Sequence, residues 1–369
     1  MTHSSMSLPA IKLRLDVIFE VGRALNSAID IDELLALIAG KTSELVSADR
    51  CSIFVVDGDN RTLWTKAQTG RERISIPIDS GIAGAAASQR AMIHVEDAYL
   101  DSRFNPEVDR QSGYITRNIL ATPMFTMEGE LIGVLQAINS NRGGFSTTDM
   151  AMFDAIAGFA ANALQNSLLY DELRKTFLSV IEVMAASIDA KHKYTAGHTA
   201  RVATYSIGIA RKMGWEEKEL DALRVAAYLH DYGKIGIPDA ILQKPSSLTD
   251  NEFSQMKSHA EITRELLSKM HLTKQYRDVP LVASSHHERM DGKGYPLGLA
   301  GEEIPLGARV MAVADVFDAL TSDRDYRKAM EPKAAVELMQ RQVGTAFDPE
   351  VFAVFEAFFE QELNFGTAG

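Results

Sequence analysis

The stretch that decides the fold and the chemistry reads Tyr228-Leu-His-Asp-Tyr-Gly-Lys-Ile-Gly-Ile-Pro-Asp239. The residues before it are rich in alanine and leucine, which predicts a helix that delivers His230 beside Asp231 and stops at Gly233. Burying an imidazole and a carboxylate is costly unless they pair with each other or coordinate a metal ion. Taken alone, such a pair is more often a hydrogen-bonded structural dyad than a metal site.

The surrounding sequence favours a metal centre. Seven of the nine histidines lie between residues 192 and 287. Nitrogen and oxygen ligands without sulfur suit first-row divalent ions such as iron or manganese. Two such ions need six or more protein ligands. Seven candidate ligands occur on separate predicted helices: His198, His230, Asp231, His259, His286, His287 and Asp315.

Length and composition indicate a folded protein of two or three domains. The chain has 369 residues, of which 46% are hydrophobic and 24% charged, and a domain takes roughly 100–200 residues. We see no apolar run of about 18 residues that would predict a membrane span, and no export signal. Cys51 is the only cysteine, so an internal disulfide is excluded. We therefore expect a cytoplasmic protein without a membrane segment.

The charge of the chain argues against a nucleic-acid polymer as partner. The formal net charge is −12, and we find no cluster of basic residues that could form a face for a duplex. An acidic protein binds phosphates only where metal ions or a few local Lys and Arg side chains reverse the field.

The first half of the chain predicts an α+β domain with an antiparallel sheet flanked by helices. Strand-like stretches follow one another without regular alternation with helices, which is typical of this class. We expect two helices within 8–48, a short helix at 81–90, and strands at 51–56, 62–67, 74–78, 91–95, 119–125 and 131–138.

The second half predicts an all-α domain, joined to the first by a long helix over 149–189. Further helices are expected at 196–213, 217–232, 250–270, 278–290, 306–320 and 331–343. In the long helix, apolar residues step by three and four, which suits either a domain core or the seam of a parallel coiled coil. For residues 160–178 we favour a dimeric signalling helix. The stripe consists of Leu169, Leu173, Phe177, Val180, Met184 and Ile188.

Residues 176–359 resemble the HD-GYP phosphodiesterases. The motifs that carry this resemblance stand in family order: His230-Asp231 with Gly233-Lys234, His286-His287-Glu288, Asp291-Gly292-Lys-Gly294-Tyr295-Pro296, and Ala314-Asp-Val-Phe-Asp-Ala-Leu-Thr-Ser322. The resemblance implies hydrolysis of the bacterial messenger cyclic di-GMP to linear pGpG, with further hydrolysis to GMP as an open alternative. In such a reaction, two cations lower the pKa of bound water, which attacks phosphorus.

The resemblance also implies a set of metal ligands. His198, His230, Asp231 and Asp315 would hold one metal ion, and His259, His286 and His287 the other, with Asp231 bridging the two. Some members of the family hold a third ion through a glutamate four residues before the first ligand histidine. Tyr194 occupies that position here. We therefore expect two ions, iron or manganese, and pGpG as the main product.

Several further residues are predicted to contact the substrate, each with a structural alternative. Lys234 would neutralise a phosphate oxygen or assist the leaving group, unless it is only a solvent-exposed lysine at a helix end. Tyr295, in a turn with Gly294 and Pro296, would stack on the substrate or hydrogen-bond to it, or else only pack the turn. Arg324 and Arg327 would clamp a phosphate or guanine, or else belong to a solvated loop.

Residues 15–165 resemble a GAF domain, the small-molecule sensor of many signalling proteins. The motifs are Gly81-Ile-Ala-Gly84, Asp97-Ala-Tyr-Leu-Asp-Ser-Arg-Phe104, Ser112-Gly-Tyr-Ile-Thr-Arg-Asn-Ile-Leu120 and Leu131-Ile-Gly-Val-Leu-Gln-Ala-Ile-Asn139. Asn141-Arg142, Phe145 and Asp149 resemble a signature of GAF domains that bind cyclic nucleotides, with arginine in place of lysine. This signature supports a pocket for cyclic GMP or cyclic AMP. The alternative is a GAF domain that only dimerises or senses another molecule.

Together these resemblances predict a homodimeric, GAF-regulated cyclic di-GMP phosphodiesterase. We expect a GAF sensor domain at 1–165, a helical linker at 166–190 and an HD-GYP phosphodiesterase domain at 176–369. Two rivals stay open. One is an HD hydrolase that acts on another nucleotide, and the other is a non-catalytic receptor or adaptor that binds cyclic di-GMP.

Overall fold

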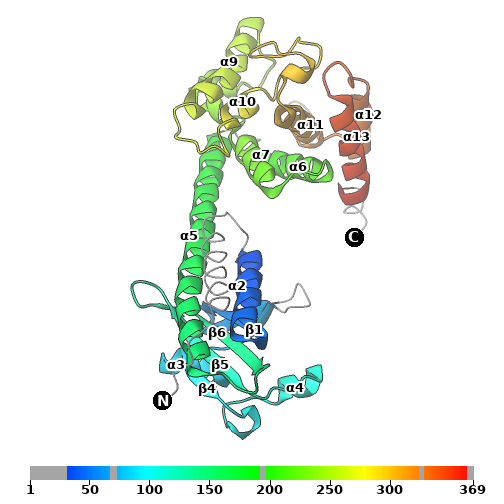
Figure 1. Cartoon of the computed structure of the whole chain (residues 1–369). Coiled ribbons are helices and arrows are strands. Elements are labelled where there is room, and N and C mark those ends of the chain that lie inside the picture. Colours follow the sequence, from blue (N-terminus) through cyan, green and yellow to red (C-terminus); the bar gives the residue numbers. More distant parts are fainter. Residues whose placement is uncertain (1–30, 67–72, 192–196, 324–327, 364–369) are drawn as a thin grey trace. The chain divides into compact units, whose positions relative to one another are not determined.

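The computed structural model describes residues 31–66, 73–191, 197–323 and 328–363. The chain divides into two compact units, Met1–Arg174 and Lys175–Gly369. The first unit is built on a β-sheet and the second on helices (Figure 1). Helix α5 (Thr147–Lys191) contributes residues to both units.

The sheet of the first unit has six strands in the order β3-β2-β1-β6-β5-β4, and every neighbouring pair is antiparallel. The predicted α+β class with an antiparallel sheet is thereby confirmed, and each predicted strand overlaps an observed one. The strands are β1 (Ala48–Asp57), β2 (Thr62–Lys66), β3 (Arg73–Pro77), β4 (Ile93–Val95), β5 (Ile119–Phe125) and β6 (Leu131–Ser140).

Strand β1 contributes side chains to two hydrophobic layers, one on each face of the sheet. Successive side chains of a strand point to opposite faces. Cys51, Ile53 and Val55 accordingly join the layer that contains α2 (Ile31–Val46) and α5, whereas Phe54 and Val56 pack in the layer that contains α3 (Gly81–Gln89). Two short helices, η1 (Ala98–Leu100) and α4 (Glu107–Ser112), lie between β4 and β5 in the chain.

A close backbone approach explains the glycine in the middle of α3. A Cβ atom at Gly84 would lie 2.6 Å from the backbone carbonyl carbon of Asp79, so only glycine lets the helix pack against the segment before it. Gly40 in α2 is a helical glycine of the same unit with open space where its Cβ would be.

We expect Gly84→Ala to lower the free energy of unfolding of the first unit by about 1–3 kcal/mol, because backbone atoms must move to admit the methyl group. Gly40→Ala should instead raise it by about 0.5–1 kcal/mol, because glycine weakens a helix interior. Urea unfolding followed by Trp64 fluorescence in a Trp215→Phe background measures both. Equal effects of the two substitutions would contradict the packing argument.

The second unit is a bundle of helices around an apolar core. Leu223 on α7, Val313 and Phe317 on α11, and Phe352 and Phe355 on α13 belong to one buried cluster. The helices are α6 (His198–Lys212), α7 (Glu217–Leu229), α8 (Asp239–Leu242), α9 (Asp250–Leu267), α10 (Val279–Ser284), α11 (Leu306–Thr321), α12 (Pro332–Gln340) and α13 (Pro349–Phe358), with short helical turns η2 (Tyr232–Gly236), η3 (Gly301–Glu303) and η4 (Phe359–Leu363).

Two helix predictions differ from the structure in an informative way. The helix predicted at 278–290 is shorter in the structure and ends at Ser284. The residues after it form a turn, in which the backbone N–H of Glu288 donates to the carbonyl oxygen of Ser285 at 3.0 Å. Helix α13 was not predicted, although its start carries a clear signal. The Asp348 carboxylate accepts hydrogen bonds from the backbone N–H groups of Glu350 and Val351, and Pro349 takes the first helical position.

The apolar stripe predicted along α5 is half buried and half exposed. Ile188 is buried, and Phe177 and Met184 pack against the helical core, so the core interpretation holds for these three residues. Leu169 and Leu173 are 54% and 65% exposed, and so is Val180 at 53%.

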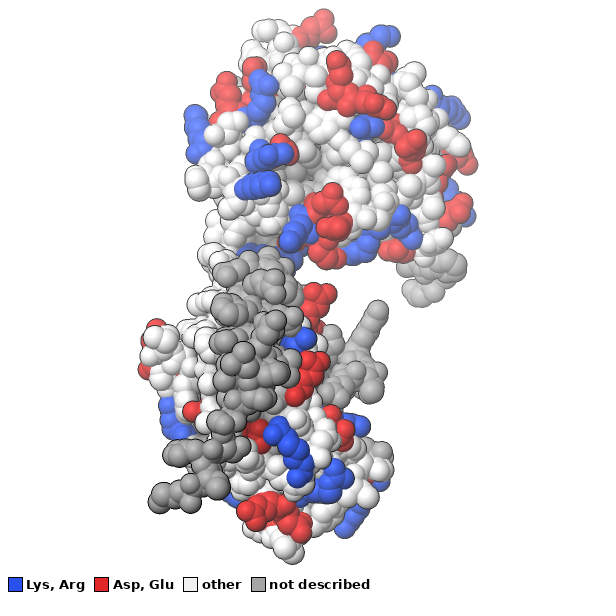
Figure 2. All heavy atoms as spheres, viewed as in Figure 1, with Lys and Arg blue, Asp and Glu red and all other residues white. Residues whose placement is uncertain are grey.

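The surface carries charges of both signs. Figure 2 shows Lys and Arg side chains interspersed with Asp and Glu on the visible face of each unit. In the part of the chain that the structure describes, none of the helices is long and apolar enough to cross a bilayer.

Candidate metal centre

The seven candidate ligands come from five places in the helical unit. His198 is the first residue of α6 and follows Gly197, whose φ of 73° favours glycine. His230 caps the C-terminus of α7, and Asp231 leads into η2. The remaining ligands lie in α9 (His259), directly after α10 (His286 and His287) and in α11 (Asp315).

Gly233 brings two of these places into contact. A Cβ atom at Gly233 would lie 2.0 Å from the carbonyl oxygen of His259, so only glycine allows η2 to approach α9 this closely. The backbone N–H of Gly233 donates to the hydroxyl of Thr263 at 2.8 Å, and that hydroxyl donates to the carbonyl oxygen of His230 at 3.0 Å. His230 and Asp231 are therefore fixed against the helix that carries His259.

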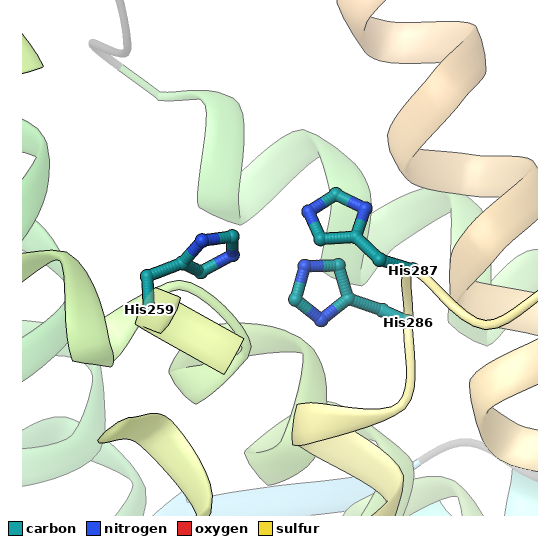
Figure 3. Close-up of side chains that lie close together, drawn as sticks. All are labelled: His259, His286 and His287. Carbon is teal, nitrogen blue, oxygen red and sulfur yellow. The ribbon is translucent and has the colours of Figure 1, made fainter. Parts of the chain in front are cut away.

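The ligand atoms converge in the buried interior. Three groups each have ligand atoms within 4.8 Å of one another. Figure 3 shows the rings of His259, His286 and His287 turned toward one another, with His259 on α9 and the other two on the segment after α10. The groups are His198, His230 and Asp315; His259, His286 and His287; and His230, Asp231 and His286.

Asp231 lies between the first two groups. Its Oδ2 atom lies 3.3 Å from Nε2 of His230 and 3.8 Å from Nε2 of His198. Its Oδ1 atom lies 3.3 Å from Nε2 of His259. The two oxygens of one carboxylate thus face different halves of the cluster, which is the arrangement that a bridging ligand requires.

Three of the histidines present an unused ring nitrogen. The Nδ1 atoms of His230, His259 and His286 lie 2.6–2.7 Å from the backbone carbonyl oxygen three residues earlier. Each Nδ1 therefore carries the proton, which leaves Nε2 as an acceptor. These Nε2 atoms are buried and find no hydrogen-bond partner among the described residues. Buried polar atoms are nearly always partnered, so this donor set fits bound metal ions.

The electrostatics of the cluster also suit metal binding. Burial lowers the pKa of His286 well below its ordinary value, and that of His287 to about 3. Burial would raise the pKa of Asp231, but nearby Lys234 and His230 outweigh it and lower the pKa. These groups are therefore neutral imidazoles and an ionised carboxylate at neutral pH, the forms that bind metal ions.

His198 differs from the other histidines. Burial disfavours its charged form, but its hydrogen bonds to Asp315 and Asp318 outweigh burial and raise its pKa to about 9. Its Nε2 atom lies 3.3 Å from Oδ1 of Asp315, and its Nδ1 atom lies 2.7 Å from Oδ2 of Asp318. A metal ion that binds at Nε2 must therefore displace a proton.

Lys234 is mostly buried and paired with Asp231. Its side chain is 19% exposed, and Nζ lies 2.5 Å from Oδ2 of Asp231. This position favours the predicted role at the site over that of a solvated lysine at a helix end, and the role stays a prediction.

The loop that contains Tyr295 is held by a buried carboxylate. Glu288 accepts hydrogen bonds from the backbone N–H groups of Leu297, Gly298 and Leu299 at 2.6, 3.1 and 3.0 Å. A Cβ atom at Gly294 would lie 2.5 Å from the Cα atom of Glu288, so the glycine is needed for the loop to fold back.

The loop places Tyr295 beside the metal cluster. The Tyr295 ring centroid lies 4.7 Å from that of His287, and the peptide bond to Pro296 is cis. The ammonium of Lys257, a residue not singled out in the sequence, lies 5.3 Å from the Tyr295 ring centroid. The sequence signal that could have identified Lys257 is its position two residues before the candidate ligand His259.

Other predicted residues lie elsewhere. Arg324 and Arg327 lie outside the described residues, as does Tyr194.

In the first unit, the backbone N–H of Asn141 donates to the carbonyl oxygen of Ser47. Phe145 and Asp149 are buried, and Asp149 accepts hydrogen bonds from Arg142 and Ser146. These contacts tie the turn between β6 and α5 together.

We expect Glu288→Gln to lower the free energy of unfolding of the second unit by about 1–3 kcal/mol, because an amide NH₂ would face backbone N–H donors in a buried site. Glu302→Gln, at an exposed glutamate in η3, is the matched control and should leave stability unchanged. Urea unfolding followed by Trp215 fluorescence in a Trp64→Phe background measures the difference. If Glu288→Gln left the free energy of unfolding unchanged, the three backbone hydrogen bonds to Glu288 would add no stability.

Comparison with known protein families identifies both units. Residues 30–164 match the family model of the GAF domain, and residues 182–351 match that of the HD domain. The chain therefore contains a GAF domain followed by a helical HD domain.

The chain is also similar to curated proteins over its HD domain. The chain is 41% identical over 177 residues to 3'3'-cGAMP-specific phosphodiesterase 3 of Vibrio cholerae, covering 48% of this chain and 38% of the relative. It is 41% identical over 194 residues to the cyclic di-GMP phosphodiesterase response regulator RpfG of Xanthomonas campestris (51% and 50%). It is 38% identical over 186 residues to a cyclic di-GMP phosphodiesterase of Thermotoga maritima (50% and 50%).

The predicted resemblance to a GAF domain followed by an HD-GYP phosphodiesterase domain is thus confirmed. The chain spans half or less of the length of these relatives.

Proposed function

We propose that this protein is a metal-dependent phosphodiesterase that hydrolyses cyclic di-GMP to linear pGpG under the control of its GAF domain. The observation that carries the proposal is the buried cluster of seven ligands around Asp231, whose two oxygens face different halves of the cluster. Relatives that share the HD domain are named cyclic di-GMP phosphodiesterases.

The proposed centre holds two divalent ions, iron or manganese. One ion would take His198, His230, Asp231 and Asp315, and the other His259, His286 and His287, with Asp231 shared. The free Nε2 atoms of His230, His259 and His286 support this assignment, and the absence of sulfur ligands fits these metals.

The residues around the centre suit attack on a phosphodiester. When bound, two divalent ions supply an activated water and neutralise charge at phosphorus. Asp231 and Asp315 provide the negative charge that retains the ions. Lys234 neutralises a phosphate oxygen or stabilises the leaving 3′ oxygen, whose departure opens the ring to pGpG. Tyr295, held beside His287 by its loop, packs against the substrate, with Gly294 and Pro296 shaping the turn.

A second substrate is favoured by a specific observation. Several relatives of comparable identity are named 3'3'-cGAMP-specific phosphodiesterases. The two cyclic dinucleotides differ only in one base, and the metal cluster acts on the phosphodiester that they share. The choice between them therefore falls to residues that contact the bases, among which we place Arg324 and Arg327.

The test is turnover of both dinucleotides by anaerobically purified full-length protein, with metal ions counted per chain. We expect two ions, and pGpG accumulating from cyclic di-GMP. Asp231→Ala should lose both ions and all turnover, because it removes the shared ligand. His287→Ala should keep one ion. His271→Ala, at an exposed histidine of the same unit, is the control and should behave as the unchanged protein.

The outcomes separate the rival functions. Preferential hydrolysis of 3',3'-cGAMP would change the assigned substrate but not the reaction. A second outcome is a protein that binds two ions but hydrolyses neither dinucleotide, with or without added cyclic GMP or cyclic AMP. This result would overturn the enzymatic function in favour of a receptor. Fewer than two ions in the unchanged protein would overturn the binuclear centre.

For the GAF domain, we propose cyclic GMP or cyclic AMP as ligand. The proposal is supported by the ion pair between Arg142 and Asp149, at 3.2 Å, because arginine keeps the positive charge of the lysine that it replaces. The predicted cytoplasmic location stays a prediction.

We also propose that α5 pairs with its copy in a homodimer. Leu169, Leu173 and Val180 are exposed apolar residues at spacings of four and seven, the pattern of a coiled-coil seam. Leu173→Lys should therefore give a monomer, as measured by light scattering after size exclusion. Tyr170→Lys adds the same charge beside the seam, where charged residues are usual, and should stay dimeric. A dimeric Leu173→Lys protein would contradict pairing through α5.

A further inference from the structure

Four histidines of the cluster have a hydrogen-bond contact at Nδ1, and the partner is of two kinds. In His230, His259 and His286, Nδ1 is held by a backbone carbonyl oxygen of the same segment. In His198, Nδ1 lies 2.7 Å from Oδ2 of Asp318, a side chain 120 residues further along the chain. The orientation of His198 therefore depends on a side chain from another helix.

Asp318 is itself held from the other side. It is 1% exposed, and a buried carboxylate needs partners to offset the loss of its hydration. Arg201, three residues after His198 on α6, donates from Nε to Oδ1 at 2.5 Å and from Nη2 to Oδ2 at 3.0 Å. Ser322 adds a hydroxyl at 3.3 Å from Oδ2.

This arrangement has a geometric consequence. Arg201 and His198 come from one helix, α6, and both contact a carboxylate on α11. Asp315, the candidate ligand that faces Nε2 of His198 at 3.3 Å, lies three residues before Asp318 on the same helix. One carboxylate of α11 thus approaches Nε2 of His198 while the other holds Nδ1, so the ring is clamped between two positions of one helix face.

We propose that Asp318, held by Arg201, is a positioning residue that sets the metal affinity of the half of the centre formed by His198, His230 and Asp315. The inference rests on the proposed function, because it assumes that metal ions bind here. A carboxylate behind a ligand histidine fixes the ring and increases its basicity, and its removal typically weakens metal binding 10- to 100-fold. The half that contains His259 and His286 is oriented by main-chain atoms and should not respond.

The competing explanation is that Asp318 only ties α6 to α11. The chain offers a matched control in Asp348, a 5% exposed carboxylate of the same unit. It pairs with Arg309 at 2.7 Å and caps α13, and among the described residues its hydrogen bonds go to Arg309 and to the backbone of Glu350 and Val351. Asp318→Asn and Asp348→Asn both remove a buried charge beside an arginine, but only the first is next to the metal cluster.

The experiment titrates Mn²⁺ into metal-free full-length protein and follows free Mn²⁺ by electron paramagnetic resonance. In Asp318→Asn we expect one ion to bind 10- to 100-fold more weakly, with the other unchanged. Asp348→Asn should bind both ions as the unchanged protein does, even where urea unfolding shows a comparable loss of stability. Arg201→Gln, which keeps the carboxylate but frees it, should weaken the same ion by a smaller factor.

The outcomes distinguish this inference from the proposed function. If the unchanged protein binds fewer than two Mn²⁺ ions, the binuclear centre itself fails. If it binds two and Asp318→Asn binds both with unchanged affinity, only the positioning role is overturned. Equal weakening in Asp318→Asn and Asp348→Asn would assign the effect to stability and would also overturn it. Should Asp318→Asn not fold, the Arg201→Gln titration decides alone.

Discussion

The cluster of candidate metal ligands depends on one close contact, the approach of the backbone at Gly233 to the carbonyl oxygen of His259. Any side chain at this position would push η2 away from α9. Oδ1 of Asp231, on the η2 side, lies 3.3 Å from Nε2 of His259, on α9. Even a small displacement of η2 would therefore pull the carboxylate of Asp231 out of reach of His259. The Thr263 hydroxyl fixes the same contact by bonding to both Gly233 and His230. The glycine of the His-Asp-x-Gly-Lys motif is thus explained by packing, not by chemistry.

The charges of the site follow from burial combined with a few fixed partners. Burial keeps His286 and His287 neutral, whereas Asp231 stays ionised because Lys234 and His230 lie beside it. Neutral imidazoles and ionised carboxylates are what divalent ions bind, so the fold itself supplies the ligands in the required protonation states. His198 is the exception, and it is also the histidine held by a carboxylate on each ring nitrogen.

Most of the fold and the choice of candidate ligands could be predicted from the sequence, because apolar periodicity and motif order are local signals. The ligand atoms of all seven candidates do meet in one buried cluster. What the sequence could not reveal was set by contacts between distant segments. The loop after α10 folds back so that the backbone N–H groups of Leu297, Gly298 and Leu299 reach Glu288, and the link from Asp318 to His198 joins residues far apart in the chain. The spacing of Asp318 three residues after Asp315 was a signal, but it does not identify the partner.

The acidic character of the protein bears on how a phosphodiester reaches this site. In the proposed reaction an anionic dinucleotide approaches a chain with a net charge of −12. Without metal ions, the two ionised carboxylates at the centre are only balanced, by Lys234 and by protonated His198, so the site has no surplus of positive charge. Lys234 is engaged with Asp231, so its charge becomes available to a phosphate only when a metal ion takes over that carboxylate. On this proposal the metal ions supply the further positive charge that the two phosphates need. Metal binding and substrate binding would then be coupled, so a substitution that weakens the ion at His198 would also weaken the binding of the proposed substrate.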